Sequence, residues 1–281
     1  MKRLIVLLGV AGVSLSALLV RWSTAPSLIL ALYRMAFAAA LMTPAALGRE
    51  SWSGLPRREL LLSVLSGAFL GLHFVCYFEA LNRTSIASAV VLVDTEVLFV
   101  ALASVLILRK RLRPRAWLAV LTAFGGGALV ALADRSGGTG ALTGDLIALA
   151  GAVCVSVYTM LGAVCRERLT TAVYTTLVYL AASGTLLGIA LASGTPLLGY
   201  GPVNLLTGLG LAVFCTLLGH SVFSWGLKYL PPAFISTVKL LEPVFSALYG
   251  FFLFGERPGG LVILGGALIL AGIGLYSREE A

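Results

Sequence analysis

Five ionisable side chains lie deep inside long apolar stretches of the chain, and these are the residues best placed to do chemistry. They are Arg34, Asp94, Glu96, Lys239 and Glu242. Inside a membrane each such charge costs about 2.5–3.5 kcal/mol on insertion scales, so it usually faces a cavity or a partner. Cations and carboxylates gathered around one cavity could bind a small polar molecule. A carboxylate that takes up a proton could couple that binding to protons.

Lys239 and Glu242 are three residues apart, so they share a face if they lie on a helix. One interpretation is a local ion pair that keeps this helix neutral. The other is that Lys239 contacts a carboxylate or phosphate of a bound molecule while Glu242 fixes the position of Lys239. Pro243 favours the second interpretation, because proline clashes with the carbonyl four residues back, which is that of Lys239. We therefore predict a hinge at Pro243.

Asp94 and Glu96 are two residues apart, which is about 200° around a continuous helix, so they are not expected to share a face. One is expected to line a cavity while the other pairs elsewhere. With Glu79, which lies near the end of its apolar stretch, the six groups comprise two cations and four carboxylates. This excess predicts that one carboxylate is protonated or has a partner such as Arg34.

A second group of candidates consists of histidines and aromatic residues in the same stretches. They are His73, Tyr77, Tyr158, His220 and Trp225. Such side chains line cavities for amphipathic molecules, and they also serve as packing or interface residues; both interpretations stay open. Because their spacing gives no metal motif, we expect no metal, no cofactor and no catalytic residue.

Composition indicates that these stretches cross a membrane. The chain has 281 residues, of which 59% are hydrophobic and 11% charged, with a mean hydropathy of +1.00. A soluble domain carries about 25% charged residues. The apolar residues form runs of the length that a membrane helix needs. The ten runs cover residues 4–20, 27–47, 60–81, 85–108, 115–133, 142–165, 171–191, 203–227, 232–254 and 259–276.

Lys and Arg in the connections predict the orientation of the helices. Of the 20 Lys and Arg, Arg34 and Lys239 lie within runs. With the N-terminus inside, four lie in outer loops, which leaves 14 for the inner side. This bias predicts an inner (plasma) membrane protein with both termini in the cytoplasm. The first run is expected to be a retained helix rather than a cleaved signal. Charges confined to helix ends also argue against nucleic-acid binding.

An internal repeat runs through the chain. A shift of 146 residues aligns 87–129 with 233–275 and superposes Glu96 on Glu242. Each half then has five helices, and because five is odd the second half is inverted. The predicted fold is all-α, with ten transmembrane helices in two inverted five-helix repeats, residues 1–135 and 142–278. Inverted repeats are common in secondary transporters, whose binding site lies between the halves.

The segment K-L-L-E-P-V-F-S, from Lys239 to Ser246, and the later Gly255-Glu256-Arg257 resemble the second repeat of the drug/metabolite transporter superfamily, EamA type. Arg34 in L-A-L-Y-R-M-A-F-A is similar to the family's second helix. The resemblance implies ten helices in two inverted repeats, cytoplasmic termini, and transport of small metabolites, often amino acids or related compounds.

Two features leave alternatives within this resemblance. Val97 stands in the first repeat where Pro243 stands in the second, so whether both halves bend alike is open. The lysine-containing segment also resembles plastid sugar-phosphate translocators of the same superfamily, in which such a lysine contacts an anion.

We therefore expect a secondary transporter that exports small polar metabolites by alternating access, driven by the substrate gradient or a proton gradient. The expected partners are a small-molecule substrate, the lipid bilayer and protons. Gly67-x-x-x-Gly71 and Gly184-x-x-x-Gly188 predict close helix approach, within one chain or in a weak dimer. We expect Lys239→Ala to abolish transport and leave folding intact.

Two other functional classes fit less well. An intramembrane enzyme would rest on Gly219-His220-Ser221 beside His73, which matches the motif of a serine protease poorly. A membrane scaffold would not need five deep ionisable residues on an inverted repeat. The sequence has no Walker A run, so the chain is not itself an ATP-driven pump.

Overall fold

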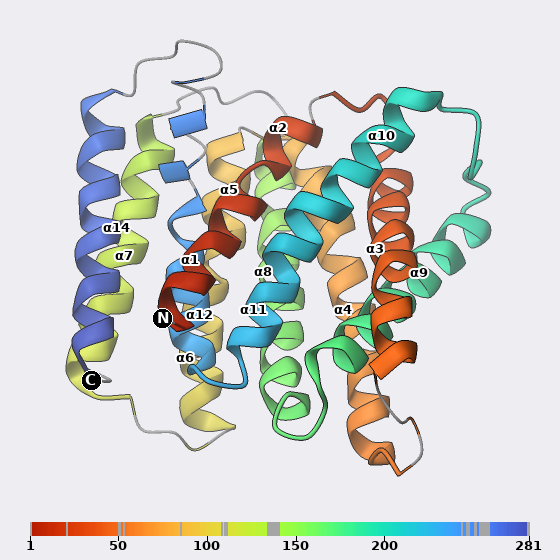
Figure 1. The fold of residues 1–281 in the computed structure, drawn as a ribbon. Helices are drawn as coiled ribbons and strands as arrows, with labels where there is room; N and C mark the ends of the chain where they lie inside the picture. The colour runs from red at the N-terminus through yellow and green to blue at the C-terminus, as the bar shows by residue number, and fades with distance from the viewer. Residues whose placement is uncertain are drawn as a thin grey trace.

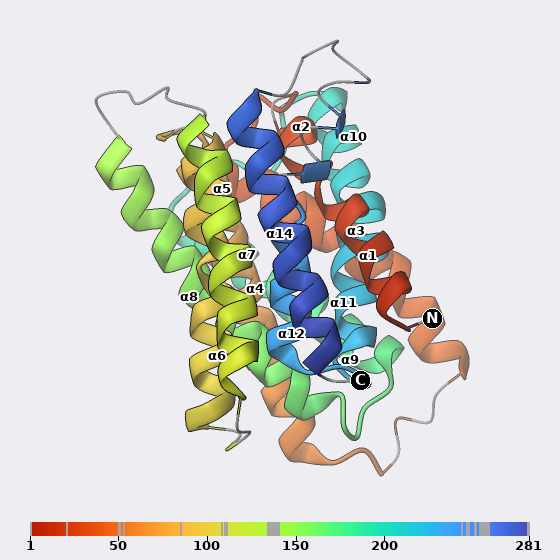
Figure 2. The ribbon, with the colours of Figure 1, turned by 90° about the vertical axis from the view of Figure 1, so that its left-hand side faces the viewer.

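In the computed structural model the chain folds into a bundle of helices (Figure 1). The structure describes residues 2–20, 22–49, 52, 54–84, 86–107, 109, 112–133, 141–242, 244, 245, 248, 249, 252 and 259–279. Every regular element in these residues is helical, as predicted. Both termini lie towards the same end of the bundle (Figures 1 and 2).

The predicted apolar runs become helices whose described ends lie within three residues of the prediction, except in the run 232–254, where the first helix ends at Lys239 and the predicted end lies outside the described residues. The helices are α1 (Lys2–Val13), α2 (Ser16–Val20), α3 (Ser27–Arg49), α4 (Arg57–Leu81), α5 (Ile86–Asp94), α6 (Glu96–Leu106), α7 (Pro114–Ala133), α8 (Ala141–Cys165), α9 (Thr171–Ala192), α10 (Pro202–Gly210), η1 (Leu211–His220), α11 (Ser221–Gly226), α12 (Pro232–Lys239) and α14 (Gly260–Glu279).

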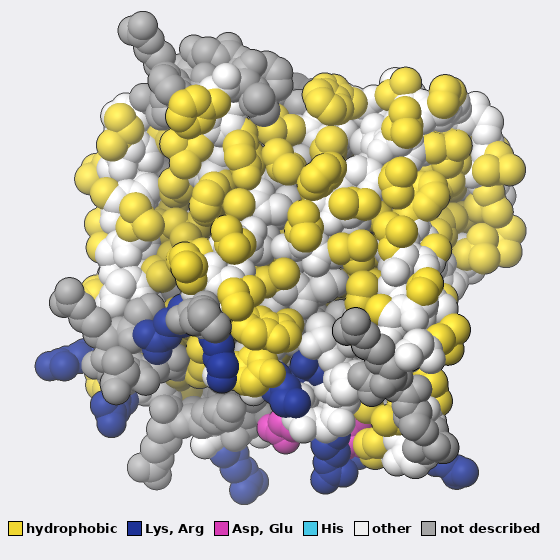
Figure 3. Space-filling model, in the orientation of Figure 1, with side chains coloured by type: hydrophobic (Ala, Val, Ile, Leu, Met, Phe, Trp, Pro, Cys, Tyr) yellow, Lys and Arg dark blue, Asp and Glu magenta, His cyan; other side chains and the backbone are white. Residues whose placement is uncertain are grey.

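The outer surface of the bundle is apolar, as a surface in contact with lipid requires. In the described part of the chain, seven helices are long and apolar enough to cross a membrane. Large apolar side chains point outward, and Leu61, Leu142 and Phe252 are 71%, 73% and 76% exposed (Figure 3). A water-soluble monomer rarely exposes so continuous an apolar surface. The predicted count of ten spans stays a prediction.

The two halves of the chain interlock rather than fold side by side. Helices α3 and α4 of the first half pack against α8 and α9 of the second, α1 packs against η1, and α7 packs along α14 (Figures 1 and 2). Under the 146-residue shift, α4 corresponds to the α10–η1–α11 segment and α8 to α1. The α4–α8 contact therefore has its counterpart in the η1–α1 contact.

Two of the predicted spans are interrupted at corresponding positions. Between α5 and α6, Thr95 N–H donates to the carbonyls of Val91 and Leu92, and its hydroxyl donates to Leu92 O at 2.6 Å. After α12, Leu240 N–H donates to a carbonyl three residues back, at 3.2 Å. Such short-range bonds satisfy carbonyls at a helix end. The first interruption forms without a proline, and Pro243, the predicted hinge, lies outside the described residues.

Segment η1 has wide π-helical geometry that turns polar residues inward. The Thr216 hydroxyl donates to the carbonyl of Leu211, five residues back, at 3.2 Å. Thr216 is fully buried and His220 is nearly so. Departures of this kind from α-helical geometry are frequent at functional sites, and here the segment presents both residues to the bundle interior.

A buried arginine ties together the turn between α8 and α9. Arg166 is 2% exposed. Its guanidinium donates to Ser224 O at 2.9 Å, to Thr171 Oγ1 at 2.7 Å and to Leu169 O. The sequence places Arg166 among the inner-loop charges, but the structure gives it a structural role, because its donors bond three neutral acceptors of the neighbouring segments.

The two glycine motifs face different surroundings. A Cβ at Gly67 would overlap the Val178 carbonyl oxygen of α9, and one at Gly71 would lie 3.2 Å from the Ala182 oxygen. Nothing lies within 4 Å of a Cβ added at Gly184. The first motif therefore packs helices within the chain, as one of the two interpretations predicted.

We expect Gly67→Ala to destabilise the protein and Gly184→Ala to leave its stability unchanged. The first substitution forces α4 and α9 apart, and overpacking of this kind costs about 1–3 kcal/mol. The second adds a methyl group to open space and is the matched control. Thermal unfolding of the purified variants in detergent measures both effects. Equal melting temperatures would contradict the close α4–α9 packing.

Candidate functional site

A small polar cavity lies in the interior of the bundle. It consists of two adjoining pockets of about 50 Å³ each, which share six lining residues. We call these two pockets together the central cavity. Its lining residues are Val13, Ser16, Arg34, His73, Phe74, Tyr77, Val90, Val93, Asp94, Glu96, Val155, His220, Phe223, Lys239 and Glu242.

Eight of the ten substrate-binding residues proposed from the sequence line this cavity. They are Arg34, His73, Tyr77, Asp94, Glu96, His220, Lys239 and Glu242. They come from α3, α4, α5, α6, η1, α12 and, for Glu242, the segment that follows the turn after α12. The fold therefore brings together charged residues that are more than 200 positions apart in sequence, such as Arg34 and Glu242.

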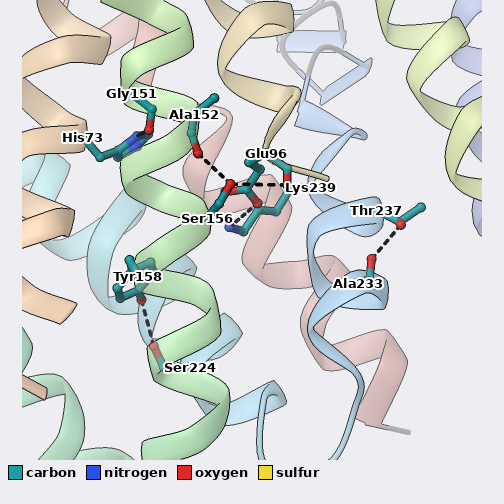
Figure 4. Close-up of polar contacts among 10 residues, drawn as sticks. All are labelled: His73, Glu96, Gly151, Ala152, Ser156, Tyr158, Ser224, Ala233, Thr237 and Lys239. Atoms are coloured by element: carbon teal, nitrogen blue, oxygen red, sulfur yellow. Dashed lines mark hydrogen bonds and ion pairs between the residues drawn. The ribbon is translucent and has the colours of Figure 1, made fainter. Parts of the chain in front are cut away.

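A buried ion pair joins the two halves of the chain beside the cavity. The Lys239 ammonium of α12 donates to Glu96 Oε1 of α6 at 2.8 Å (Figure 4). The two residues are 8% and 3% exposed. The Ser156 hydroxyl of α8 donates to the backbone carbonyl of Glu96 at 3.4 Å. Removing either partner of an ion pair this deeply buried strongly destabilises the protein, because the remaining charge is left without its partner.

This ion pair argues against one of the two interpretations that the sequence left open for Lys239. That interpretation placed the ion-pair partner of Lys239 at Glu242, on the same helix. Among the described residues the ion pair of Lys239 is with Glu96, and none is found with Glu242. The spacing argument fails because α12 ends at Lys239, so the two residues do not lie on one continuous helix.

Asp94 and Glu96 also depart from the prediction, because both line the cavity. On a continuous helix they would point to opposite sides. The turn at Thr95 interrupts the helix between them. The interruption therefore adds a carboxylate to the cavity that a regular helix would turn away from it.

Arg34 is the second cation of the cavity and is held from three sides. It is 1% exposed. Its Nε donates to Thr216 Oγ1 at 2.8 Å, and Nη1 lies 3.4 Å from Ser16 Oγ. The guanidinium carbon stacks 3.9 Å from the centre of the Phe74 ring, a cation–π contact. These contacts fix the guanidinium at the cavity wall with most of its five donors still available.

Four buried polar atoms on the cavity wall have no hydrogen-bond partner among the described residues. They are Tyr77 Oη, Asp94 Oδ2, Glu96 Oε2 and His220 Nδ1. Buried polar atoms are nearly always hydrogen-bonded in proteins. Their gathering around one cavity indicates that another molecule, water or a ligand, completes their bonds.

The two histidines have different local roles. His73 Nδ1 lies 3.1 Å from the Gly151 carbonyl of α8 and donates to it, because a carbonyl only accepts (Figure 4). The ring of His220 packs edge-on against Phe74, with centroids 5.2 Å apart. His73 therefore joins α4 to α8, while the orphaned Nδ1 of His220 remains available to a bound molecule.

The last two residues proposed from the sequence, Tyr158 and Trp225, do not line the cavity. The Tyr158 hydroxyl lies 3.0 Å from Ser224 Oγ (Figure 4). The Tyr158 ring packs against the His220 ring, with centroids 6.0 Å apart. Trp225 packs against Tyr229, with ring centroids 5.0 Å apart, at the end of α11. Tyr158 thus supports the cavity wall, and Trp225 belongs to the periphery.

Sequence reasoning missed several residues that hold the charged groups in place. Ser16, Phe74 and Thr216 fix Arg34, and the Lys239 ammonium lies 5.4 Å from the centre of the Phe223 ring. Serine, threonine and phenylalanine are unremarkable in apolar runs, so their types gave no signal. Ser16 begins a new helix after the first apolar run is interrupted. The nearby Ser14 is the sequence signal that could have indicated this interruption.

The serine of the candidate enzyme motif is engaged elsewhere. Ser221 Oγ lies 2.8 Å from the Tyr179 hydroxyl, and the Nδ1 atom of His73 bonds a backbone carbonyl. Among the described residues, Ser221 therefore does not bond a histidine base, as the nucleophile of a serine protease would. No group of three or more potential ligands arranged to hold a metal ion occurs within the described part of the chain.

A larger pocket, of about 350 Å³, lies apart from the central cavity. It is bordered by the end of α8 and the connection between α11 and α12, with Glu167, Lys228 and Tyr229 in its wall. It shares no lining residue with the central cavity among those described. Of these two sites, only the central cavity is lined by buried charged side chains in the part of the chain that is described.

Comparison with known proteins gives related transporters. An uncharacterized transporter from Archaeoglobus fulgidus is 27% identical over 227 residues, which cover 78% of this chain and 76% of that protein. The pseudopaline exporter CntI from Pseudomonas aeruginosa is 28% identical over 237 residues, covering 83% and 80%. A protein solved by crystallography superposes with a TM-score of 0.82 at 21% identity, over 99% of this chain and 97% of its own, which shows the fold.

The family assignment comes from a match along nearly the whole chain. A sequence profile of the EamA-like transporter family matches residues 2–132 and again residues 142–278. The two matched segments divide the chain where the sequence repeat divides it. The all-helical fold, the apolar outer surface and the buried charges fit a membrane transporter. The chain therefore belongs to the EamA-like transporter family.

Proposed function

We propose that this chain exports small polar metabolites, such as amino acids or related compounds, across the inner membrane by alternating access. The observation that carries the proposal is the buried Lys239–Glu96 ion pair at 2.8 Å, which joins the two halves beside a cavity lined by further charges. In this family of transporters, a polar centre of this kind is the natural place for a polar substrate to be held.

The size of the cavity supports alternating access. Each pocket of about 50 Å³ has room for a few water molecules, since one water needs about 10–15 Å³ of such space. Typical ligand pockets measure about 300–1,000 Å³. The small cavity supports a cycle in which the halves move apart to admit a metabolite.

The pairing of helices supports a pseudo-twofold relation between residues 1–135 and 142–278. The contacts α3–α9 and α7–α14 each join corresponding helices, and α4–α8 corresponds to η1–α1. The interruptions after Asp94 and Lys239 also fall at nearly corresponding positions. Two inverted halves of this kind can exchange conformations and open the same site to either side.

The distribution of charge supports cytoplasmic termini. Lys and Arg side chains gather at the end of the bundle near which both termini lie (Figures 1 and 3). Cytoplasmic connections of membrane proteins carry an excess of these residues. With this orientation, the turn at Arg166 and the start of α4 at Arg57 face the cytoplasm.

The relatives support export of a small metabolite, since one is named a pseudopaline exporter. Exchange of sugar phosphates or organic anions remains the second candidate, because Lys239 and Arg34 both line the cavity. It ranks lower because Glu96 already holds the Lys239 ammonium. The counterflow experiment described next also tests whether a proton gradient drives the cycle.

Substrate counterflow in proteoliposomes tests the proposal. Vesicles loaded with amino acids, carboxylates, sugar phosphates or nucleosides are assayed for uptake of the labelled compound, with and without a pH gradient. Exchange of amino acids or related compounds is the expected result. Exchange of sugar phosphates alone would favour the second candidate, and no exchange of any class by folded protein would contradict transport of these metabolites.

A further inference from the structure

The two halves differ at the position that neutralises the buried carboxylate. Under the 146-residue shift, Glu96 corresponds to Glu242, and Lys239 corresponds to Val93. Lys239 of the second half neutralises Glu96 of the first. The symmetric counterpart would be a lysine at position 93 that neutralises Glu242. Valine occupies that position, so the second carboxylate lacks the partner that symmetry would give it.

The position of Val93 shows where the missing cation would lie. Val93 and Glu242 line both pockets of the central cavity. No hydrogen bond or ion pair of the Glu242 carboxylate is found in the part of the chain that the structure describes, whereas Glu96 has Lys239 at 2.8 Å. The space beside Glu242 that a lysine would fill is therefore part of the cavity itself.

The charges of the cavity wall do not balance. Arg34 and Lys239 are its cations, and Asp94, Glu96 and Glu242 are its carboxylates. Lys239 balances Glu96, and Arg34 can balance one of the remaining two carboxylates. One negative charge is left over in a buried site, where an unpaired charge is costly. Asp94 Oδ2 is also without a hydrogen-bond partner among the described residues.

We propose that Glu242, with Asp94 beside it, receives the positively charged group of the transported molecule. The cargo supplies to Glu242 the cation that Lys239 supplies to Glu96. The substrate class is therefore one that carries an ammonium or similar group, and Val93 keeps the place for that group open. This inference rests on the proposed transport function and specifies which chemical feature of the cargo the site recognises.

Matched pairs of probes test the recognition of a cation. Proteoliposomes containing the full chain are assayed by counterflow with leucine, lysine, their N-acetylated forms, and malate. We expect compounds with a free amino group to exchange and their acetylated forms to exchange at least about tenfold less, equivalent to about 1.4 kcal/mol. Equal rates for free and acetylated forms, or exchange of malate alone, would overturn the inference and leave the transport function standing.

Variants locate the recognition at Glu242. Glu242→Gln is expected to slow exchange of the amino compounds at least about tenfold. Glu79→Gln, the control, removes a carboxylate that pairs with Arg83 outside the cavity and should keep the wild-type rate. A Glu242→Gln protein that exchanges at the wild-type rate would overturn the inference. A Glu242→Gln protein whose exchange keeps the wild-type rate but no longer depends on a pH gradient would also overturn the inference. In that case Glu242 would bind a proton rather than the transported molecule.

A lysine at position 93 tests the missing partner directly. Val93→Lys supplies an internal cation and is expected to abolish exchange of amino compounds. Adding Glu242→Gln to Val93→Lys should lower the melting temperature, because the new lysine loses its partner, whereas adding Glu242→Gln to Val93→Met, of similar length and no charge, should lower it less. An equal change of melting temperature in the two backgrounds, or wild-type exchange by Val93→Lys, would overturn the inference. Wild-type protein that exchanges no probe would refute the proposed function as well.

Discussion

Purified Lys239→Ala protein is expected to lose exchange by at least about 100-fold and to unfold at a lower temperature than the wild type. The loss of stability follows from the structure, since the substitution leaves Glu96 buried at 3% exposure without its partner at 2.8 Å. Breaking a buried ion pair by removing one partner costs about 3–5 kcal/mol. Counterflow and thermal unfolding in detergent measure the two effects. The sequence-based expectation that folding stays intact is revised for this reason.

A double variant separates the role of Lys239 in the fold from its role in transport. Replacing both members of a buried pair by apolar residues of similar volume is often neutral for stability. Lys239→Met combined with Glu96→Leu is therefore expected to recover the wild-type melting temperature and to remain inactive. Wild-type exchange by this double variant would show that the ion pair serves only the fold and would contradict its place in the proposed polar centre.

The Arg34→Ala variant is expected to lose exchange by a comparable factor. Arg34 is one of the two cations in the wall of the central cavity, and the carboxylates of Asp94 and Glu242 line the same pocket. Without Arg34, two carboxylates face each other with no countercharge, and like charges in a buried site repel strongly. Counterflow of the metabolite panel and the melting temperature of the purified protein measure the effect.

Two variants show which property of Arg34 matters. Arg34→Lys keeps the charge, but an ammonium cannot reproduce the planar contacts with Thr216 and the Phe74 ring; we expect a partial loss of about tenfold. Thr216→Val removes one hydrogen bond to the guanidinium, worth about 1.5–3 kcal/mol, and leaves the charge in place. This variant should be less stable and still active. Full activity of Arg34→Ala would contradict the role of the arginine.

The small cavity and the buried ion pair have a common consequence for the proposed transport cycle. The halves separate only if contacts such as Lys239–Glu96 adapt, and a substrate promotes this only if it binds the open form better than the closed form. A cargo that neutralises Glu242 meets this requirement, because it removes the surplus charge of the cavity. We therefore expect the two ends of the proposed cycle to differ in how the same few charges are paired.

Most of the secondary structure could be predicted from the sequence, because it depends on local properties. A run of about 20 apolar residues favours a helix wherever it lies in a bilayer, since the backbone must satisfy its own hydrogen bonds there. The deep charges Arg34, Asp94, Glu96, Lys239 and Glu242 could be recognised as candidates for the same reason, because their cost inside a membrane depends only on their type and depth.

The partners of those charges could not be predicted, because they depend on long-range packing. Spacing offered Glu242 as one candidate partner of Lys239, whereas the fold brings α12 against α6 and pairs Lys239 with Glu96, 143 positions away. Spacing likewise assumed a continuous helix through Asp94 and Glu96, and the turn at Thr95 directs both to the cavity. No proline or glycine marks that turn in the sequence.

The sequence by itself thus determined that the chain forms long apolar helices and which charged residues lie within the apolar runs, and it predicted a repeat with a shift of 146 residues. Only the tertiary structure decided that Gly67 packs against α9 while Gly184 faces open space, and that Glu96 rather than Glu242 holds Lys239. The physical reason is the range of the interactions. Hydropathy and backbone hydrogen bonding act within a helix, whereas ion pairs and helix contacts form between segments that only folding brings together.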